Sequence, residues 1–164
     1  LSMNTHPEPV EGAPRACRGV TLREHNMANC IFCQIIRGEA PSWKVYEDEY
    51  TVAFLDIHPV NPYHTLVIPK AHSENIFDTP PEVLAQVMRT IKHVTTLYEE
   101  KLGIHNVQII SSSGAQAQQD VFHLHFHIIP RHAGDGQNVH WHTHAELQAE
   151  FDRMLTRLTE GESQ

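Results

Sequence analysis

Residues 122–131 read Phe122-His123-Leu124-His125-Phe126-His127-Ile128-Ile129-Pro130-Arg131. Side chains of a β-strand alternate between its two faces, so a strand over 121–129 predicts His123, His125 and His127 on one face. The apolar residues between them would then face the core. Two interpretations of the histidine face stay open at this point: a metal site, and a histidine nucleophile with supporting histidines.

Composition limits the kinds of partner that the chain can bind. The 164 residues suit one domain with a real core and are too few for two. With 12 basic and 20 acidic residues the net charge is −8, which argues against a nucleic-acid polymer or an anionic membrane as partner. The 14 histidines outnumber Lys and Arg together and favour an active site or a metal site.

The chain divides into a tail and a patterned region. Residues 1–29 are rich in proline and charge, lack a hydrophobic period and lack the apolar core of a secretory signal, so we predict a flexible N-terminal tail. Residues 30–164 are predicted to form a single domain. No run of about 18 apolar residues is present, so the sequence predicts no membrane span.

The patterned region predicts an α+β fold with an antiparallel sheet. The expected strands cover 43–47, 50–56, 64–69, 106–110 and 121–129. The expected helices are a short one over 30–37 ending at Gly38, a long one between Asp78 and Gly103 with Asp78 or Thr79 as N-cap, and a last one opened by a Thr143-x-x-Glu146 capping box.

A second candidate motif is the Cys30-x-x-Cys33 pair. A thioredoxin-like redox pair should follow a strand and open a long helix, whereas this pair begins the patterned chain. Half of a zinc site fits better, with two tetrahedral positions left for histidines such as His72 and one of the strand histidines. Two buried thiols that pack as small hydrophobic groups are the simpler alternative.

A third and weaker pattern is Asp56-Ile57-x-Pro59 followed by His64 at the head of a strand. An aspartate at a strand end can accept hydrogen bonds from sugar hydroxyls, and a histidine that opens the next strand can reach the same pocket. Asp-x-x-Pro is also ordinary turn chemistry, so the pattern alone is not specific.

Taken together, these motifs resemble those of the histidine triad (HIT) family, in its nucleotide-binding branch of phosphoramidate hydrolases and bacterial relatives. The similarity runs from about Cys30 to Arg131. Its segments, in order, are C-I-F-C-x-I-I-x-G-x-x-P, V-Y-E-D, F-L-D-I-x-P, H-x-L-V-I-P-K-x-H and H-L-H-F-H-I-I-P-R. The resemblance implies a five-stranded antiparallel sheet with helices and pairing as a homodimer.

The resemblance also implies a role for each site residue. His125 would be the nucleophile that attacks the α-phosphate of a nucleoside phosphoramidate, with His127 and His64 as further catalytic histidines. The implied substrate-binding residues are Phe32, Ile35, Asp56, Ile57, Ser112, Gln119 and Asp120. The zinc-bearing bacterial pattern implies a structural zinc held by Cys30, Cys33, His72 and His123.

The loop before the histidine strand departs from the family pattern N-x-G-x-x-x-G-Q-S-V. Ser112 stands in place of a phosphate-contacting Asn, Gln118 in place of a glycine, and Asp120 in place of the serine. An extra carboxylate near an anionic substrate costs binding unless it faces away or pairs with a cation. Substrate choice is therefore expected to differ from the family norm.

With the resemblance, the sequence thus predicts a cytoplasmic, homodimeric hydrolase that acts on a purine nucleotide derivative, a nucleoside phosphoramidate or a related nucleotide, and releases a nucleoside monophosphate through a nucleotidyl-histidine. The alternatives are a nucleotide-binding regulatory or adaptor protein with little turnover, and a dinucleoside polyphosphate hydrolase. A redox metalloenzyme with all three histidines on one metal is a further alternative.

Overall fold

The computed structural model describes Met27 and residues 29–160. The chain separates into two compact units, the first ending at Arg131 and the second beginning at His132. The predicted N-terminal tail lies almost entirely outside the described residues, so it stays a prediction. No helix in the described part of the chain is long and apolar enough to cross a membrane.

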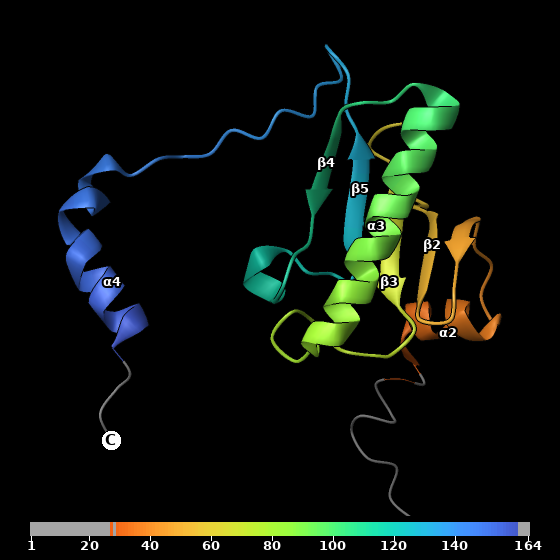
Figure 1. Ribbon diagram of the computed structural model, residues 1–164, viewed down its shortest axis with the longest axis horizontal. Helices are drawn as coiled ribbons and strands as arrows, with labels where there is room; N and C mark the ends of the chain where they lie inside the picture. The colour runs from red at the N-terminus through yellow and green to blue at the C-terminus, as the bar shows by residue number, and fades with distance from the viewer. Residues whose placement is uncertain (1–26, 28, 161–164) are drawn as a thin grey trace, which may run out of the picture. The chain divides into compact units, whose positions relative to one another are not determined.

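The first unit is built on one five-stranded sheet in the order β1-β2-β3-β5-β4 (Figure 1). The strands are β1 (Lys44–Glu47), β2 (Thr51–Leu55), β3 (Thr65–Pro69), β4 (Val107–Ile110) and β5 (Phe126–Pro130). All neighbouring strands pair antiparallel. The α+β fold predicted from the sequence is confirmed.

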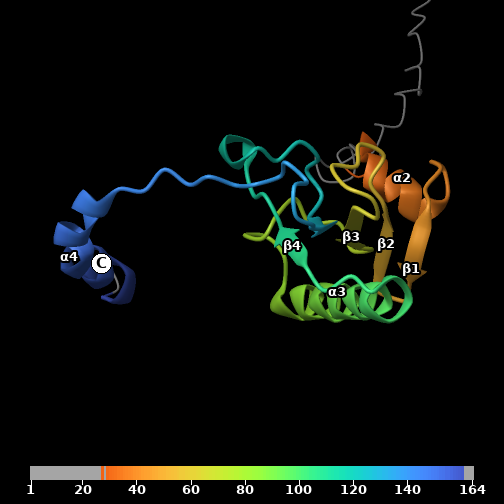
Figure 2. The same ribbon diagram turned by 90° about the horizontal axis from the view of Figure 1, so that it is seen from above.

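The two faces of the sheet are covered by different helices, as Figure 2 shows from above. The long helix α3 (Pro81–Leu102) packs Val87, Ile91 and Val94 against one face. The short helix α2 (Ile31–Arg37) packs Phe32 and Ile35 against the other. Successive side chains of a strand point to opposite faces and so contribute to both cores. In β3, Val67 joins the α3 core, and its neighbours Leu66 and Ile68 join the α2 core.

The predicted helix ends are confirmed, but the predicted N-cap is wrong. Gly38 and Gly103 adopt left-handed conformations, with φ of 75° and 65°, and end α2 and α3. The N-cap of α3 is Pro80, without a side-chain hydrogen bond. The Asp78 carboxylate instead accepts hydrogen bonds from the backbone N–H groups at positions 74 and 75, so it closes the preceding turn.

The histidine strand is shorter than predicted. Ladder pairing begins at Phe126, whereas His123 N donates to Val121 O and Leu124 N donates to Ser73 O, at 2.9 and 2.8 Å. Residues 121–125 form no ladder pairs, so the predicted strand is confirmed only from Phe126 onward. The predicted alternation of side chains nevertheless holds: Phe32 packs against both His123 and His125, His127 lines the same pocket as His125, and Phe126 and Ile128 join the α3 core.

The second unit, taken by itself, consists of the 3₁₀ segment η2 (Ala145–Glu150) followed by α4 (Phe151–Thr159). The predicted C-terminal helix is present, but the Thr143-x-x-Glu146 capping box is wrong. The residue before η2 is His144, which makes no side-chain cap. Glu146 accepts a hydrogen bond from the His144 ring instead, at 2.9 Å.

The α3-facing core predicts the effect of truncating Ile128. Its side chain is fully buried, so Ile128→Ala should lower the free energy of unfolding by about 2–5 kcal/mol. Met88→Ala on the exposed side of α3 serves as control and should change it by less than about 1 kcal/mol. Urea denaturation followed by circular dichroism measures both, and equal effects of the two changes would contradict this core assignment.

Candidate active site and metal centre

Two thiols and two imidazoles from distant parts of the chain converge on one point. Cys30 precedes α2, Cys33 lies within it, His72 follows β3, and His123 lies in the segment before β5. The Cys33 Sγ to His72 Nδ1 distance is 3.3 Å, and Cys30 Sγ and Cys33 Sγ lie 3.5 and 3.6 Å from His123 Nδ1. The two Nδ1 atoms are 3.2 Å apart.

These separations fit a zinc ion. Tetrahedral zinc with Zn–S and Zn–N bonds of ordinary length places its ligand atoms about 3.3–3.6 Å apart. The donor set of two sulfurs and two nitrogens is also one that zinc prefers. The structure therefore brings together all four residues of the predicted metal site.

Hydrogen bonding leaves the required nitrogen of His123 available. Its Nε2 donates to the Pro69 carbonyl at 2.9 Å, which leaves the lone pair on Nδ1, the atom that faces the thiols. Burial lowers the pKa of His123 to about 4, so the ring is neutral. Burial, and then the neighbouring Cys30, raise the pKa of Cys33 to about 12 when no metal is present, so metal binding would release a proton.

The ring of His125 is fixed in one tautomer. Its Nδ1 donates to the backbone carbonyl of His123 at 2.7 Å, so the lone pair lies on Nε2. The Ser111 hydroxyl donates to the His125 carbonyl at 2.8 Å and holds the backbone, while the Phe32 ring packs edge-on at a centroid distance of 5.4 Å. An imidazole held in this tautomer has its Nε2 lone pair available for nucleophilic attack.

A hydrogen-bonded chain orients His127. Val60 N donates to His64 Nδ1 at 3.3 Å, which favours a proton on His64 Nε2. That proton is donated to His127 Nδ1 at 2.9 Å, so His127 carries its own proton on Nε2 and can donate it to a bound group. Asp56 Oδ2 lies 3.5 Å from His64 Nε2 and 3.7 Å from His127 Nδ1 and supports the pair.

Asp56, His64 and His127 also offer three close donor atoms for a metal. Binding there would require His64 Nε2 to lose the proton that the Val60 N–H favours on it. Burial lowers the pKa of His64, with Asp56 opposing, and burial followed by repulsion from His125 and His64 lowers that of His127 to about 4. A network of neutral, hydrogen-bonded histidines is therefore the better interpretation of this second cluster.

The histidine pocket, a cavity of about 470 Å³ on the α2 side of the sheet, gives a small molecule access to these rings. Its apolar wall is formed by Phe32, Ile35 and Phe54. The predicted site residues that line it are Phe32, Ile35, Asp56, Ile57, Asp120, His125 and His127. His64 lines an adjoining cavity that shares Asp56.

Two predicted substrate-binding residues do not line the histidine pocket. The Gln119 side chain is buried within its own loop, where it accepts from Gly114 N and donates to the carbonyls of Glu74 and Val121. Ser112 lines neither the histidine pocket nor the cavity beside His64. The substrate-binding roles of these two residues stay predictions.

Some features of the site have no sequence signal. Trp43 lines the histidine pocket although it stands in an ordinary alternating strand pattern. The backbone carbonyls of Pro69 and His123 set the tautomers of two rings, and no side-chain pattern indicates such acceptors. Gln118, by contrast, adopts φ of 67°, a left-handed conformation that favours glycine, and its sequence signal is the glycine of the family pattern at this position.

The fold and the site define a class of α+β proteins in which a histidine-rich segment borders both a ligand pocket and a Cys/His metal cluster. The HIT domain model matches residues 37–134. The chain belongs to the HIT family.

Three relatives illustrate the similarity. Protein hit from Bacillus subtilis is 44% identical over 74% of this chain and 85% of its own length. The Saccharomyces cerevisiae protein named adenosine 5'-monophosphoramidase HNT1 is 40% identical over 77% of this chain and 77% of its own length. A structure of a Zn-bound histidine triad family protein from Mycobacterium smegmatis superposes with a TM-score of 0.65 at 34% identity, covering 79% of this chain and 98% of that one.

The metal cluster predicts how zinc content responds to substitution. We expect about one zinc per chain in the purified protein and less than about 0.2 in Cys33→Ser, because three ligands hold zinc much more weakly than four. His105→Ala, which removes an exposed histidine outside the cluster, should retain the zinc. Elemental analysis after dialysis measures this, and full zinc content in Cys33→Ser would rule out the assigned ligand set.

The depressed pKa of His127 predicts a pH dependence of stability. Between its ordinary value of 6.5 and about 4, the unfolded chain binds a proton at His127 that the folded protein does not. The free energy of unfolding should therefore fall as the pH drops through this window, by up to about 1.4 kcal/mol per pH unit from this group. Urea titrations at several pH values should show a shallower slope for His127→Gln than for the wild type, and equal slopes would contradict the cause assigned here.

Proposed function

We propose that this HIT protein hydrolyses nucleoside phosphoramidates or related nucleotides at the α-phosphate and releases a nucleoside monophosphate. The observation that carries the proposal is the tautomer of His125. Its Nδ1–H is hydrogen-bonded to a backbone carbonyl, so its Nε2 lone pair is left for a substrate in the histidine pocket. The name of the yeast relative, adenosine 5'-monophosphoramidase, supports the same reaction class.

The reaction proceeds in two displacements. His125 Nε2 forms a bond to phosphorus as the P–N bond to the leaving amine breaks, which produces a nucleotidyl-histidine. The amine nitrogen gains one proton in this step: the His64–His127 pair, beside the bound anionic phosphate, takes up a proton from solvent, and His127 passes one from Nε2 to the amine and returns to its neutral form. Water then attacks phosphorus, breaks the bond to His125 and gives up one proton, so the sum of both steps is hydrolysis.

The remaining groups of the pocket suit a nucleotide. The apolar wall formed by Phe32, Ile35 and Phe54 takes the base, and Asp56, beside Ile57, accepts from the ribose hydroxyls. Histidine donors and backbone amides neutralise the phosphate, so turnover needs no added divalent metal. Ser112 and Gln119 remain proposed contributors to the phosphate-binding loop.

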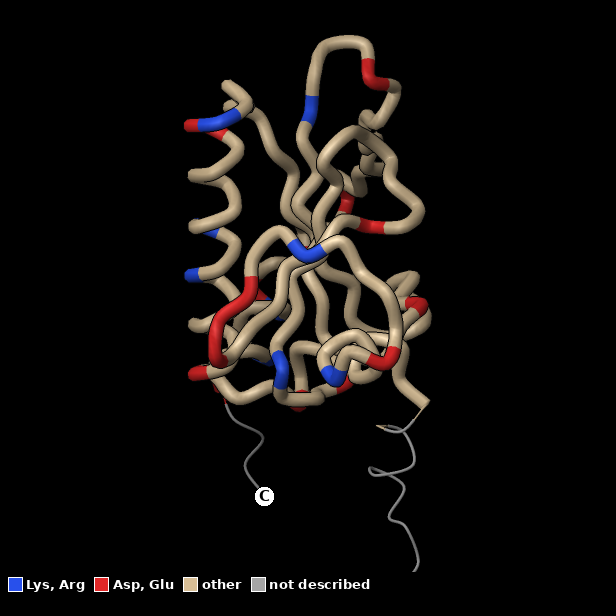
Figure 3. Tube along the Cα trace, turned by 90° about the vertical axis from the view of Figure 1, so that its right-hand side faces the viewer, with Lys and Arg blue, Asp and Glu red and all other residues tan. Residues whose placement is uncertain are grey.

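We assign to the Cys30, Cys33, His72 and His123 cluster a structural zinc. When bound, zinc supplies a cross-link between α2 and the segment before β5 and takes no part in the reaction. The same proposal includes a cytoplasmic homodimer in which residues 30–164 act as one domain. It includes neither a nucleic-acid polymer nor a membrane as partner, since the 20 acidic residues outnumber the 12 basic ones; Figure 3 marks the two kinds along the described trace.

A second candidate function is nucleotide binding with little turnover, as in a regulatory or adaptor protein. The observation in its favour is Asp120, whose Oδ1 lies 3.8 Å from His125 Nε2. A carboxylate at this distance repels an incoming phosphate. Dinucleoside polyphosphates are alternative substrates for the same nucleophile.

Replacement of the nucleophile tests the proposal. His125→Ala should lower AMP release from an adenosine phosphoramidate by at least about 10³-fold, because no other group in the pocket forms the covalent intermediate. Its affinity for AMP, measured by calorimetry, should stay within about threefold because the apolar wall and Asp56 are intact. Full activity in this variant would falsify the assignment, whereas AMP binding by a wild type that releases no product would favour the adaptor function.

A further inference from the structure

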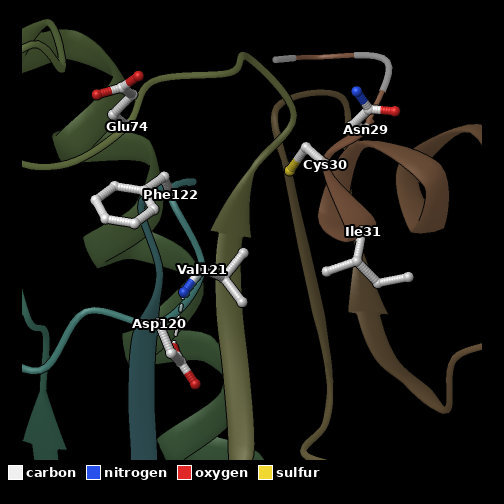
Figure 4. Close-up of a pocket in the computed structure, with 7 residues that line it drawn as sticks. All are labelled: Asn29, Cys30, Ile31, Glu74, Asp120, Val121 and Phe122. Carbon is white, nitrogen blue, oxygen red and sulfur yellow. Dashed lines mark hydrogen bonds between the residues drawn. The ribbon is translucent and has the colours of Figure 1, made fainter. Parts of the chain in front are cut away.

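Two cavities meet at Asp120. Asp120, Val121 and Ile31 line both the histidine pocket and a second space of about 400 Å³, which we call the outer cavity. Phe122 and Glu74 border the outer cavity on one side, and the start of α2 borders it on the other (Figure 4). The shared residues make the outer cavity the neighbouring space into which part of a bound substrate can extend.

The Asp120 carboxylate is held beside the reactive nitrogen. Its Oδ1 accepts a hydrogen bond from Val121 N at 2.8 Å, drawn dashed in Figure 4, and lies 3.8 Å from His125 Nε2. The Asp120 side chain is 85% exposed, whereas that of His125 is 3% exposed. The carboxylate therefore keeps its hydration at the mouth of the pocket, while the His125 ring is almost fully enclosed.

In-line displacement places the leaving group on the far side of phosphorus from His125 Nε2. A nucleophile and phosphorus meet at about 3–3.5 Å, and the leaving atom lies one bond beyond phosphorus, about 5 Å from the nucleophilic nitrogen. Asp120 Oδ1 lies 3.8 Å from His125 Nε2 and lines both cavities, so a leaving group that extends from the histidine pocket into the outer cavity passes this carboxylate. A charge carried by that group will interact with it directly.

We propose that Asp120 is a specificity-determining residue that selects leaving amines carrying a positive charge over neutral or negatively charged ones. This inference rests on the proposed hydrolase function and names the leaving-group class of the same site. Glu74 adds a second acidic residue to the outer cavity, and the residues that line it, all in the described part of the chain, include no Lys or Arg. The face of the Phe122 ring offers a further favourable contact for an ammonium group.

Three adenosine phosphoramidates that differ only in the tail of the leaving amine test this selection. The amines are a diaminobutane, a butylamine and an aminobutanoate, which carry a positive, a neutral and a negative tail. We expect the wild-type kcat/KM to be about tenfold higher for the positive tail than for the negative one, since one exposed charge contributes at most about fivefold in either direction. Asp120→Asn keeps the shape, removes the charge and should reduce the ratio to below about twofold.

Two controls separate local from general effects. Glu100→Gln, on the exposed side of α3 and outside both cavities, removes the same charge and should leave the wild-type ratio unchanged. Raising the salt concentration should shrink the ratio in the wild type more than in Asp120→Asn, because screening acts on the charge and a loss of structure would show no such dependence.

Affinities of the same three compounds, measured by calorimetry with His125→Ala, keep this inference distinct from the proposed function. If the wild type hydrolyses none of them, the hydrolase function fails. In that case, tighter binding of the positive tail by His125→Ala that is lost in the double variant His125→Ala/Asp120→Asn still supports the role of Asp120. A ratio that Asp120→Asn leaves unchanged, in turnover and in affinity, overturns the role of Asp120. Failure of all three compounds to bind overturns both proposals.

Discussion

The site depends on His123, whose ring belongs to the metal cluster and whose backbone carbonyl holds the ring of His125. Its ring nitrogen Nδ1 faces the two thiols and His72, while its backbone carbonyl accepts a hydrogen bond from Nδ1–H of His125. The ring in turn is oriented by the Pro69 carbonyl at the end of β3. Any shift of the metal cluster therefore moves the acceptor that determines which nitrogen of the nucleophile carries the lone pair.

The departure of residues 121–125 from the sheet makes this arrangement possible. In a regular strand the carbonyl of His123 would be engaged with, or directed toward, a neighbouring strand. Here the backbone bonds of His123 and Leu124 go to Val121 and Ser73. The carbonyl of His123 is consequently available to a side chain two residues later, and three histidines in a row acquire three different environments.

The sequence predicts the scaffold well and the details of the site less well, for physical reasons. Side chains of β2 and β3 alternate between the two cores, and because a helix covers each face both strands are short continuous apolar runs bounded by turns, which is how the sequence identifies them. The ring tautomers depend on backbone carbonyls, which no side-chain pattern reveals. The sequence does not identify the N-cap of α3, because an aspartate suits a cap and a turn equally well and the Asp78 carboxylate hydrogen-bonds to the preceding turn in the fold.

The metal cluster joins Cys30 to His123, 93 positions apart in the chain. Contacts of such long range are costly to form early, since the entropy of closing the intervening loop must be lost first. The pocket wall depends on the same closure because Phe32 and Ile35 lie on the helix that carries Cys33. Helix α2 is therefore expected to dock late in folding, after the sheet and α3 have formed. The ligand pocket would then be complete only when this last long-range contact has formed.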